Sequence, residues 1–430
     1  MAKRRDQHPV VHGETAPAFD RVRSLFEHNM RTLAEENAQL CVYHKGRKVV
    51  DLWATHPDTL QFSGDSLVNI FSSGKSLESI AIASLVGKGL LDYDALISNY
   101  WPDFSGGGKE SVRVSDLMRH EAGLVNFSRS INTTDLLTPN IKQNRVGEII
   151  EQESQRFASG GSSRREYHAM TRGWIANELY RRVDPAGRTI GEYLREDLSD
   201  ALGVDIFIGL EEAHLEQVAP VRLLDPKKHI LESLKPRLFG RRVQHNLFQL
   251  IARVWRPLWA LRKGRSAGSQ PAPVEGMRNI DIFNEAGMMQ GETPSANTHA
   301  NARSLAKVAA IMSAGGELDG DRCLDKTGWS ALHNHPVPAE MGNFMPTRFT
   351  QGGVDRFLPI TEQSSMLEKA FNGGREGFYG WMGLGGSIFQ WHPEHEIGLA
   401  FVPTSLHLLD LLNERGKFYQ AEVLRCVASE

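Results

Sequence analysis

The chain has 430 residues, of which 40% are apolar, and a formal net charge of −3, as in an ordinary soluble globular protein. This length is long for a single hydrophobic core and predicts two lobes. The near-zero charge gives no reason to expect a nucleic-acid partner. Three widely spaced cysteines, Cys41, Cys323 and Cys426, predict neither a disulfide framework nor a metal site.

The start of the chain is basic, with Lys3, Arg4 and Arg5, but no apolar segment follows it. The sequence therefore predicts no secretory signal, unless a leader has been removed. No apolar run is long enough to predict a membrane-spanning helix. We expect a cytoplasmic protein, and the sequence makes no prediction of its oligomeric state.

The N-terminal part of the chain is predicted to alternate between helices and strands. Its pattern predicts a helix, a hairpin, a strand and a second helix, at 18–33, 39–44 with 48–53, 66–71 and 72–86. The second helix is apolar on nearly every face from Ile80 to Val86, as expected of a helix that is buried all round.

Ser72 lies where the predicted strand meets this buried helix, and Lys75 follows one helical turn later. Free backbone N–H groups at a helix start favour developing negative charge, and a desolvated lysine can take a proton from a serine hydroxyl. Ser-x-x-Lys at a helix start is typical of penicillin-recognising serine enzymes. A second copy, Ser304 to Lys307, lies in an ordinary amphipathic pattern, and we interpret it as a surface coincidence.

The middle of the chain is predicted to be mostly helical, with helices at 114–120, 146–155, 171–183 and 189–198. Residues 211–275 are unusual, because basic residues far outnumber acidic ones between Asp225 and Arg265. Within this segment, 243–263 has apolar residues at helical spacing with arginines between them, and 264–273 has the composition of a linker. Such a basic amphipathic helix can lie on an anionic membrane surface, cover an apolar pocket, or simply pack on the body with solvated arginines.

The C-terminal part of the chain is predicted to contain a helix, three neighbouring antiparallel strands and a last helix. These elements are expected at 301–314, 378–383, 385–391, 397–403 and 410–426. No internal repeat is visible in the sequence.

Several short motifs together resemble the serine β-lactamase-like superfamily, and most closely its branch of class C β-lactamases, D-alanyl-D-alanine peptidases and cytoplasmic esterases. The motifs, in family order, are Ser72-Ser73-Gly74-Lys75, Gly89-Leu90-Leu91-Asp92-Tyr93-Asp94, Leu117-Met118-Arg119-His120-Glu121-Ala122-Gly123-Leu124, Tyr167-His168-Ala169, Asn301-Ala302-Arg303-Ser304-Leu305-Ala306 and Trp381-Met382-Gly383-Leu384-Gly385-Gly386. The resemblance covers most of the chain except about 211–275.

The resemblance implies an α/β (α+β) fold with an antiparallel sheet flanked by helices and an inserted, mainly helical lobe. We expect a discontinuous α/β lobe from 15–90 and 290–430, and a helical lobe from 91–289 that includes the basic insertion at 211–275. The active site is then expected in the cleft between the two lobes.

The resemblance also implies a catalytic set of Ser72 as nucleophile, Lys75 as its proton partner and Tyr167 as a proton shuttle. A lysine ammonium beside a tyrosine favours the phenolate, which can move a proton between serine, leaving group and water. The third position of the tyrosine motif is Ala169, where the family has Asn or Ser, so one side-chain contact to substrate is missing.

The third family motif is usually Lys-Thr-Gly or His-x-Gly, but here it is Trp381-Met382-Gly383. Tryptophan offers an apolar face and one N–H donor instead of a positive charge, so a neutral ester is favoured over an acid-bearing β-lactam. The backbone N–H groups of Ser72 and of Leu384, beside Gly383, are expected to form the oxyanion hole.

Other motifs do not predict a site. The histidines of 333–335 and of 392–395 lack a helical His-Glu-x-x-His frame, so no metal and no cofactor are expected. Gly264-Arg265-Ser266-Ala267-Gly268 has the letters of an α/β-hydrolase elbow but no strand before it and no helix after it.

The sequence thus predicts a cofactor-free serine hydrolase that cleaves carboxylic esters through an acyl-enzyme. Three alternatives remain open at this point. The chain is a β-lactamase or D-aminopeptidase-type hydrolase, an acyltransferase, or a non-catalytic scaffold of the same fold that contacts a membrane through 243–263.

Overall fold

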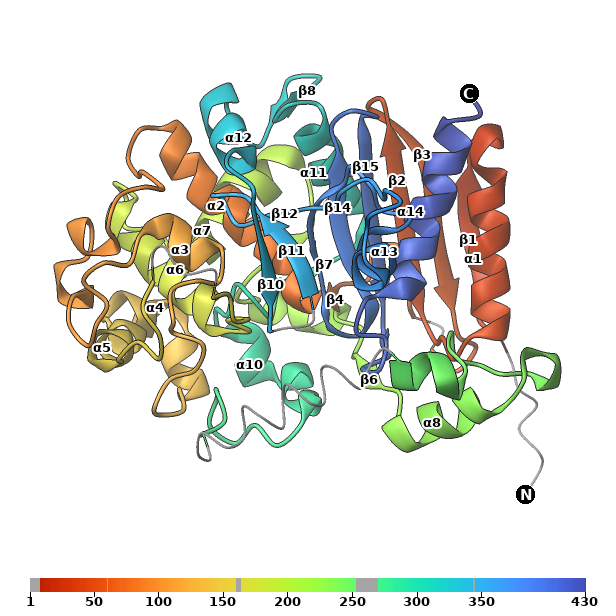
Figure 1. The fold of residues 1–430 in the computed structure, drawn as a ribbon, viewed down its shortest axis with the longest axis horizontal. Coiled ribbons are helices and arrows are strands. Elements are labelled where there is room, and N and C mark those ends of the chain that lie inside the picture. Colours follow the sequence, from red (N-terminus) through yellow and green to blue (C-terminus); the bar gives the residue numbers. More distant parts are fainter. Residues whose placement is uncertain (1–7, 60, 160–163, 253–269, 343–344) are drawn as a thin grey trace.

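The computed structural model describes residues 8–59, 61–159, 164–252, 270–342 and 345–430. Its centre is an antiparallel sheet of nine strands in the order β1-β3-β2-β15-β14-β13-β12-β11-β10 (Figure 1). The strands are Val10–Thr15 (β1), Ala38–His44 (β2), Arg47–Thr55 (β3), Val337–Met341 (β10), Met345–Phe349 (β11), Asp355–Arg356 (β12), Tyr379–Met382 (β13), Ile388–His392 (β14) and Ile397–Pro403 (β15). This sheet confirms the predicted α/β fold class.

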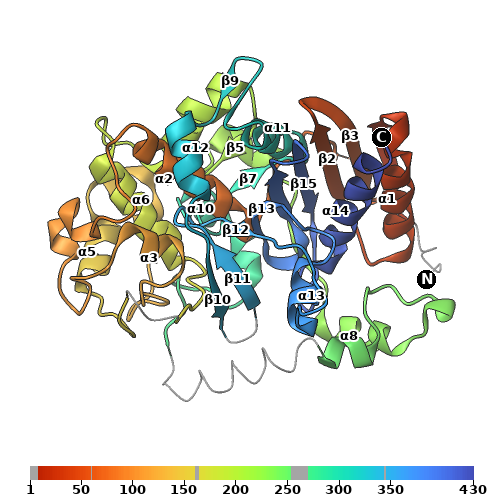
Figure 2. The ribbon, with the colours of Figure 1, turned by 45° about the horizontal axis from the view of Figure 1, so that its top comes forward.

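The sheet is covered by helices on both faces, and its residues alternate between them. α1 (Asp20–Thr32) and α14 (Glu414–Val427) cover one face, and α11 (Ala302–Ser313) packs on the other (Figures 1 and 2). Along β15, Leu399 belongs to the apolar cluster under α1 and α14, whereas Ala400 belongs to the cluster on the α11 side. A central strand buried on both faces explains why 397–403 is apolar without a break.

One glycine sets how closely α11 approaches the sheet. A Cβ placed on Gly398 of β15 would lie 2.3 Å from the backbone nitrogen of Ala310 in α11, so the helix rests on the strand backbone itself. The helix that carries the second Ser-x-x-Lys copy is therefore a packing element of the sheet.

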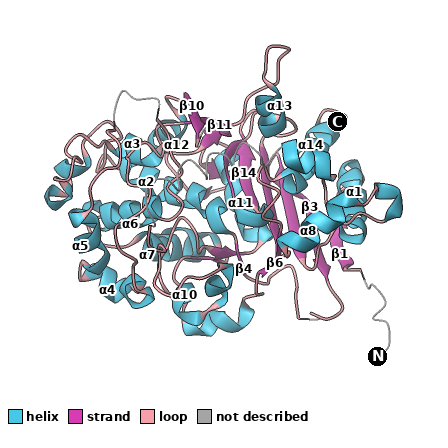
Figure 3. Cartoon of the chain, turned by 60° about the horizontal axis from the view of Figure 1, so that its bottom comes forward, coloured by secondary structure: helices cyan, strands magenta, loops and turns pink. Residues whose placement is uncertain are grey.

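The remaining helices gather beside the sheet (Figure 3). They are α2 (Lys75–Gly87), α3 (Val114–Met118), α4 (Thr138–Lys142), α5 (Arg145–Gln152), α6 (Thr171–Val183), α7 (Ile190–Tyr193), α10 (Ala286–Gln290) and α12 (Lys326–His333), with the π-helical segment 194–200 after α7. The short α13 (Met366–Asn372) lies instead near α14 (Figure 1). The predicted helix 189–198 thus exists as an α-helical turn continued by a π-helix, and the other predicted helices of this region are present.

Several strands escaped the sequence prediction. β10, β11 and β12 extend the sheet beyond β13, although their sequences lack a regular alternation of apolar and polar residues. The predicted strand 66–71 is regular only at Val68–Asn69 (β4), which joins His299–Ala300 (β7) and Ile206–Phe207 (β5) in a separate three-stranded sheet. β8 (Glu317–Leu318) and β9 (Asp321–Arg322) form a small hairpin at the predicted turn.

Residues 222–252 of the basic insertion lie against the sheet side of the molecule (Figure 1), whereas 273–275 pair with Ile131 of the helical part. Arg222–Leu223 (β6) pairs with Ser405–Leu406 (β16), α8 spans Pro226–Leu234, and residues 247–252 are helical. The Ala34 N–H donates to the Arg242 carbonyl at 2.8 Å. On these contacts we propose that 222–252 belongs with the α/β lobe, and not with the helical lobe in which the sequence placed it.

Two other predictions fall wholly or partly outside the described residues. Most of the amphipathic helix predicted over 243–263 lies there, as does most of the linker 264–273, which contains the Gly-x-Ser-x-Gly letters. The division into 15–90 with 290–430 and 91–289 otherwise stays a proposal.

Among the described residues, no helix is long and apolar enough to cross a membrane.

Candidate active site

Ser72 is presented by a sharp backbone turn at the entrance to α2. Phe71 adopts the left-handed region at φ 48°, which is uncommon for a bulky residue, and its N–H donates to Asn69 Oδ1 at 2.7 Å. Its ring packs edge-on against Phe283 at 5.1 Å. The chain then forms the 3₁₀ turn Phe71–Gly74 (η2), which leaves Ser72 half-buried at the start of a fully buried helix. Backbone strain concentrated beside a reactive side chain is typical of functional sites.

Lys75 reaches back from the first turn of α2 to Ser72. Its Nζ lies 3.2 Å from Ser72 Oγ, 2.7 Å from the carbonyl oxygen of Ala169 and 2.9 Å from that of Ser295. Burial and the neighbouring Arg172 guanidinium lower the pKa of Lys75 well below its ordinary value. A neutral amine fits these partners, because two N–H bonds serve the two carbonyls and the lone pair then faces the serine hydroxyl.

A buried ion pair supports the backbone of α2 beneath Lys75. Arg172 of α6 donates to Glu78 at 2.7 Å and to the carbonyl oxygen of Lys75 at 2.9 Å. Glu78 in turn accepts a 2.6 Å hydrogen bond from the Ser295 hydroxyl. Ser295 therefore connects the ion pair to the amine, since its carbonyl is one of the acceptors of Lys75. The sequence analysis missed this pair, although a glutamate inside an apolar helix was a visible signal.

Tyr167 lies over Lys75 and contacts Ser72 and Trp381. Lys75 Nζ lies 4.8 Å from the centre of the Tyr167 ring, and the indole N–H of Trp381 donates to the Tyr167 oxygen at 3.1 Å. Burial raises the pKa of Tyr167, while hydrogen bonds with Ser72 and Trp381 partly offset this effect. The net effect is a raised pKa, so Tyr167 is a protonated phenol at neutral pH. The predicted lysine-stabilised phenolate is therefore wrong for the resting site.

Two neutral histidines hold the loop that carries Tyr167. His168 donates its backbone N–H to His120 Nδ1 at 3.1 Å, and its Nε2 accepts from the Leu124 N–H at 3.0 Å. Burial lowers the pKa of His168 to about 4 and that of His120 well below its ordinary value. The His120 ring lies 5.0 Å from the Tyr167 ring. Both residues stand in motifs quoted above, but their mutual contact was not predicted.

Trp381 lies on β13, which is tied to the start of the nucleophile helix. The backbone N–H of Trp381 donates to Ser76 Oγ at 2.9 Å, and the residue is only 3% exposed. Its aromatic neighbours include Phe349, 5.0 Å away. The prediction that Trp381 offers an open apolar face to substrate is therefore wrong. The only N–H donor of its side chain is directed at Tyr167, and the exposed residues here are Ala169 and Leu384.

Gly383 allows β13 to approach Ser72 closely. A Cβ at this position would lie 2.0 Å from Ser387 Oγ and 2.3 Å from the Ile70 carbonyl oxygen. Ser387 also donates to that carbonyl at 2.6 Å. Leu384 then begins the short 3₁₀ turn Leu384–Gly386 (η11), so its N–H has no partner within the turn. The Leu384 amide is therefore a candidate donor for an oxyanion, and its role in the oxyanion hole stays a prediction.

The second Ser-x-x-Lys copy does not form a comparable pair. Ser304 Oγ accepts a hydrogen bond from the Asp205 N–H at 2.9 Å, and Lys307 binds the Leu202 carbonyl and Asp321. Its two side chains are therefore engaged with different partners, which agrees with a coincidence, but Ser304 is buried and not on the surface as predicted.

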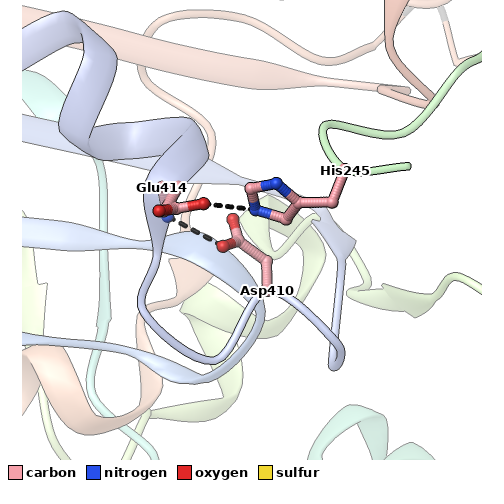
Figure 4. Close-up of side chains that lie close together, drawn as sticks. All are labelled: His245, Asp410 and Glu414. Atoms are coloured by element: carbon pink, nitrogen blue, oxygen red, sulfur yellow. Dashed lines mark hydrogen bonds and ion pairs between the residues drawn. The ribbon is translucent and has the colours of Figure 1, made fainter. Parts of the chain in front are cut away.

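One group of described residues outside the motifs has the composition of a metal site. His245, Asp410 and Glu414 bring one ligand atom each within 4.8 Å of one another (Figure 4). Asp410, however, caps α14 by accepting the N–H groups of Glu414 at 2.8 Å and Arg415 at 3.1 Å. Glu414 already forms ion pairs with His245 and Lys417. These partners fit an ion-pair network better than a cation site.

Cavities near the motifs are small. A cavity of about 20 Å³ beside Ala169 is lined mainly by apolar side chains, including Phe127, Met170 and Trp174. Larger surface cavities of about 680 and 470 Å³ share Glu36 and Arg222 and do not include Ser72. The site thus brings together a serine, a buried amine and a tyrosine.

Known proteins resemble this chain over most of its length. A family model described as Beta-lactamase matches residues 22–421. The protein "Esterase/beta-lactamase LipL" of Mycobacterium tuberculosis is 29% identical over 375 residues, which are 85% of this chain and 76% of that protein.

Solved structures share the fold. A penicillin-binding protein homologue from Caulobacter crescentus is 25% identical, with a TM-score of 0.71 and coverage of 97% of this chain and 100% of the other. A family VIII carboxylesterase is 22% identical, with a TM-score of 0.73 and the same coverage. EstA from Arthrobacter nitroguajacolicus Rue61a is also 22% identical, with a TM-score of 0.71 over 96% of this chain and 98% of the other.

Proposed function

This chain belongs to the beta-lactamase family, and we propose that it is a serine hydrolase that cleaves carboxylic esters through an acyl-enzyme on Ser72. The observation that carries the proposal is the position of Lys75 Nζ, 3.2 Å from Ser72 Oγ in a fully buried environment. A buried amine that is neutral at working pH can accept the serine proton as the hydroxyl attacks a carbonyl carbon.

In the first step, Ser72 Oγ forms a bond to the ester carbonyl carbon, and its proton passes to Lys75. The carbonyl oxygen takes the negative charge and accepts hydrogen bonds from the N–H groups of Ser72 and Leu384. Collapse of this intermediate breaks the bond to the alcohol oxygen, which leaves with a proton. Water then attacks the acyl-enzyme, restores Ser72 and releases the acid.

Tyr167 suits the role of the group that protonates the leaving alcohol. It enters the cycle as a phenol, because burial raises its pKa. The Trp381 N–H donates to the same oxygen and favours the phenolate that forms when the proton is given away. The proton then held by Lys75 restores the phenol, so the set returns to its starting state after each half-reaction.

The substrate class follows from the absence of a positive charge on Trp381. A carboxylate on the substrate would find no cation at this position, because the indole is buried and its only N–H is already used on Tyr167. A neutral ester meets no such penalty. The names of the esterases to which the chain is similar support this choice. Hydrolysis of β-lactams is the second candidate, because the name of the Mycobacterium tuberculosis relative includes both activities.

The test compares intact-mass spectra and p-nitrophenyl ester turnover of the wild type, Ser72→Ala and Ser304→Ala. A fluorophosphonate should add to the wild type and to Ser304→Ala, which is the matched control from the second motif copy, but not to Ser72→Ala. Ester turnover should follow the same pattern. Normal ester hydrolysis by Ser72→Ala would show that the proposed nucleophile is wrong, whereas β-lactam turnover without ester turnover would favour the second candidate.

A further inference from the structure

Helix α8 buries polar side chains and exposes apolar ones, which is the reverse of the pattern of a water-facing helix. Its buried side consists of His229, Glu232 and Ser233, which are at most 8% exposed. Its outward side carries Leu231 and Leu234, which are 62% and 57% exposed. A helix at a protein–water boundary normally buries its apolar stripe. This helix presents that stripe to its surroundings.

The same arrangement continues in the residues after α8. Of the twelve large apolar residues that are exposed in the described chain, seven lie between residues 230 and 251, which is far more than their share of the sequence. We call these seven side chains the apolar face; they are Ile230, Leu231, Leu234, Leu238, Phe239, Phe248 and Ile251. The most exposed are Leu238 at 91%, Phe248 at 83% and Phe239 at 73%.

Positive charge accompanies the apolar face. Residues 226–252 contain six lysines and arginines but one acidic residue, Glu232, which is already paired with Lys235 at 2.6 Å. A groove of about 420 Å³ beside the face is lined by a set of cations from two elements; they are Arg31 of α1 and Arg237, Arg241 and Arg242. No acidic side chain lines this groove, and Arg241 Nε is buried without a protein partner among the described residues.

The segment is fixed to the body through its polar side. Glu232 accepts a hydrogen bond from the Arg242 N–H at 3.1 Å, which holds the turn after α8 against the helix. β6 pairs with β16, and His245 forms an ion pair with Glu414 of α14. These contacts leave the apolar face outward on a supported platform at the edge of the molecule (Figures 1 and 2).

We propose that the apolar face docks the protein on an anionic lipid bilayer. Leu238 and Phe239 at the turn after α8 enter the interfacial region, while the arginine-lined groove holds lipid phosphate groups. Exposed aromatic and aliphatic side chains bordered by lysine and arginine are what a bilayer surface with anionic headgroups binds. Charge complementarity selects this occupant, because an anionic headgroup can pair with Arg241, whose Nε has no protein partner among the described residues, and a neutral apolar partner cannot.

The docked segment connects directly to the candidate active site. The Leu224 N–H donates to the Leu406 carbonyl at 2.9 Å, and Leu406 packs against Gly385 of η11. The His407 N–H also donates to the Gly385 carbonyl at 3.2 Å. The strand β6, which precedes the apolar face, is thus connected to Leu384 through β16 and Gly385. Docking would bring membrane-dissolved esters near the site.

The test is vesicle sedimentation of the full chain with phosphatidylcholine vesicles and with vesicles of phosphatidylcholine and phosphatidylglycerol. We expect binding to the anionic vesicles and a weaker interaction at high salt. The double variant Leu238→Ser/Phe239→Ser should bind about ten-fold more weakly or worse. Lys227→Glu/Lys228→Glu should have a similar effect through charge. Met366→Ser is the matched control, because Met366 is 89% exposed but lies on α13.

Turnover of a small water-soluble ester should be unchanged in these variants, which separates docking from catalysis and from misfolding. Equal binding of wild type and Leu238→Ser/Phe239→Ser would overturn the proposal, as would a lack of binding to either vesicle. Sedimentation velocity tests whether a second copy of the chain covers the apolar face. A wild-type dimer that dissociates in the double variant, without vesicle binding, would show that a second copy of the chain covers the face instead.

Discussion

The indole N–H of Trp381 lies 3.1 Å from the phenolic oxygen of Tyr167 and donates a hydrogen bond to it. The tryptophan thus occupies the position of a family cation but acts on the tyrosine with a neutral donor. A neutral donor stabilises a phenolate less than a full positive charge would, and this difference agrees with a tyrosine that rests as a phenol.

Removing this donor should weaken catalysis without dismantling the site. Trp381→Phe keeps an aromatic ring but loses the N–H, so we expect kcat to fall about ten-fold, the equivalent of one hydrogen bond of about 1.4 kcal/mol. The alkaline limb of the pH–rate profile should move to higher pH, because the phenolate loses its donor. Trp391→Phe is the control. Trp391 lies on the neighbouring strand β14, and its Nε1 donates to His333 of α12 at 2.9 Å. An identical profile in both variants would refute the assigned role of Trp381.

The pH dependence of the wild type should show a base with an unusually low pKa. Activity requires the neutral amine of Lys75, whose pKa is depressed, so kcat/KM rises with pH through a value well below that of an ordinary lysine. Tyr167 must remain protonated, so the profile falls only at the raised pKa of this phenol. Lys75→Arg keeps a positive charge but cannot lose its proton, and it should lower kcat at least about a thousand-fold. A rise of kcat/KM centred near the ordinary lysine pKa of about 10.4 would contradict this assignment.

The ion pair between Glu78 and Arg172 should contribute to stability more than surface pairs do. Both side chains are fully buried, so Arg172→Ala leaves an unpaired carboxylate and should cost about 3–5 kcal/mol of unfolding free energy. Arg322→Ala, which breaks an exposed pair with Glu317, should cost less than about 1 kcal/mol. Chemical denaturation of Arg172→Ala, Glu78→Ala and the double variant Glu78→Ala/Arg172→Ala measures the coupling, with Arg322→Ala as the exposed control. If the double variant lost the sum of the two single effects, the residues would be energetically independent.

Gly383 should tolerate no side chain. Its Cβ would meet Ser387 Oγ at 2.0 Å and the Ile70 carbonyl at 2.3 Å, so Gly383→Ala must displace β13 from the entrance of α2. We expect ester turnover to fall about a hundred-fold or more, because Leu384 follows directly and its N–H would leave the oxyanion position. Gly287→Ala is the control, since its Cβ would meet only Thr133 Oγ1 at 3.7 Å. Full activity of Gly383→Ala would remove the Leu384 amide from the proposed mechanism.

The sequence predicted what depends on local pattern. Ser72 and Lys75 are one helical turn apart, so their contact follows from helix geometry alone, and the runs 378–403 are apolar enough to identify β13, β14 and β15. Tyr167 was placed correctly beside them through motif order. The short strand Asp355–Arg356 has no apolar alternation, because it is held by its neighbours and not by its own pattern.

Contacts between distant segments could not be predicted from the sequence. The Trp381–Tyr167 hydrogen bond and the Arg172–Glu78 pair join residues from different elements, and either residue of each pair has other plausible partners. The outward apolar side of α8 was also hidden, because the usual rule assigns an apolar stripe to the core. Only the burial of His229 and Ser233 shows which side faces inward.

The pairing of β2 with β15 also has a consequence for synthesis of the protein. Ala38 lies opposite Pro403, so this step of the sheet joins residues from near the two ends of the chain. A chain still emerging from the ribosome cannot form it until β15 has been made, since contacts this distant in sequence form late. The β2–β3 hairpin must wait with an unpaired, apolar edge, which is the kind of edge that chaperones protect. Truncation before β15 would therefore remove the partner of β2 as well as α14.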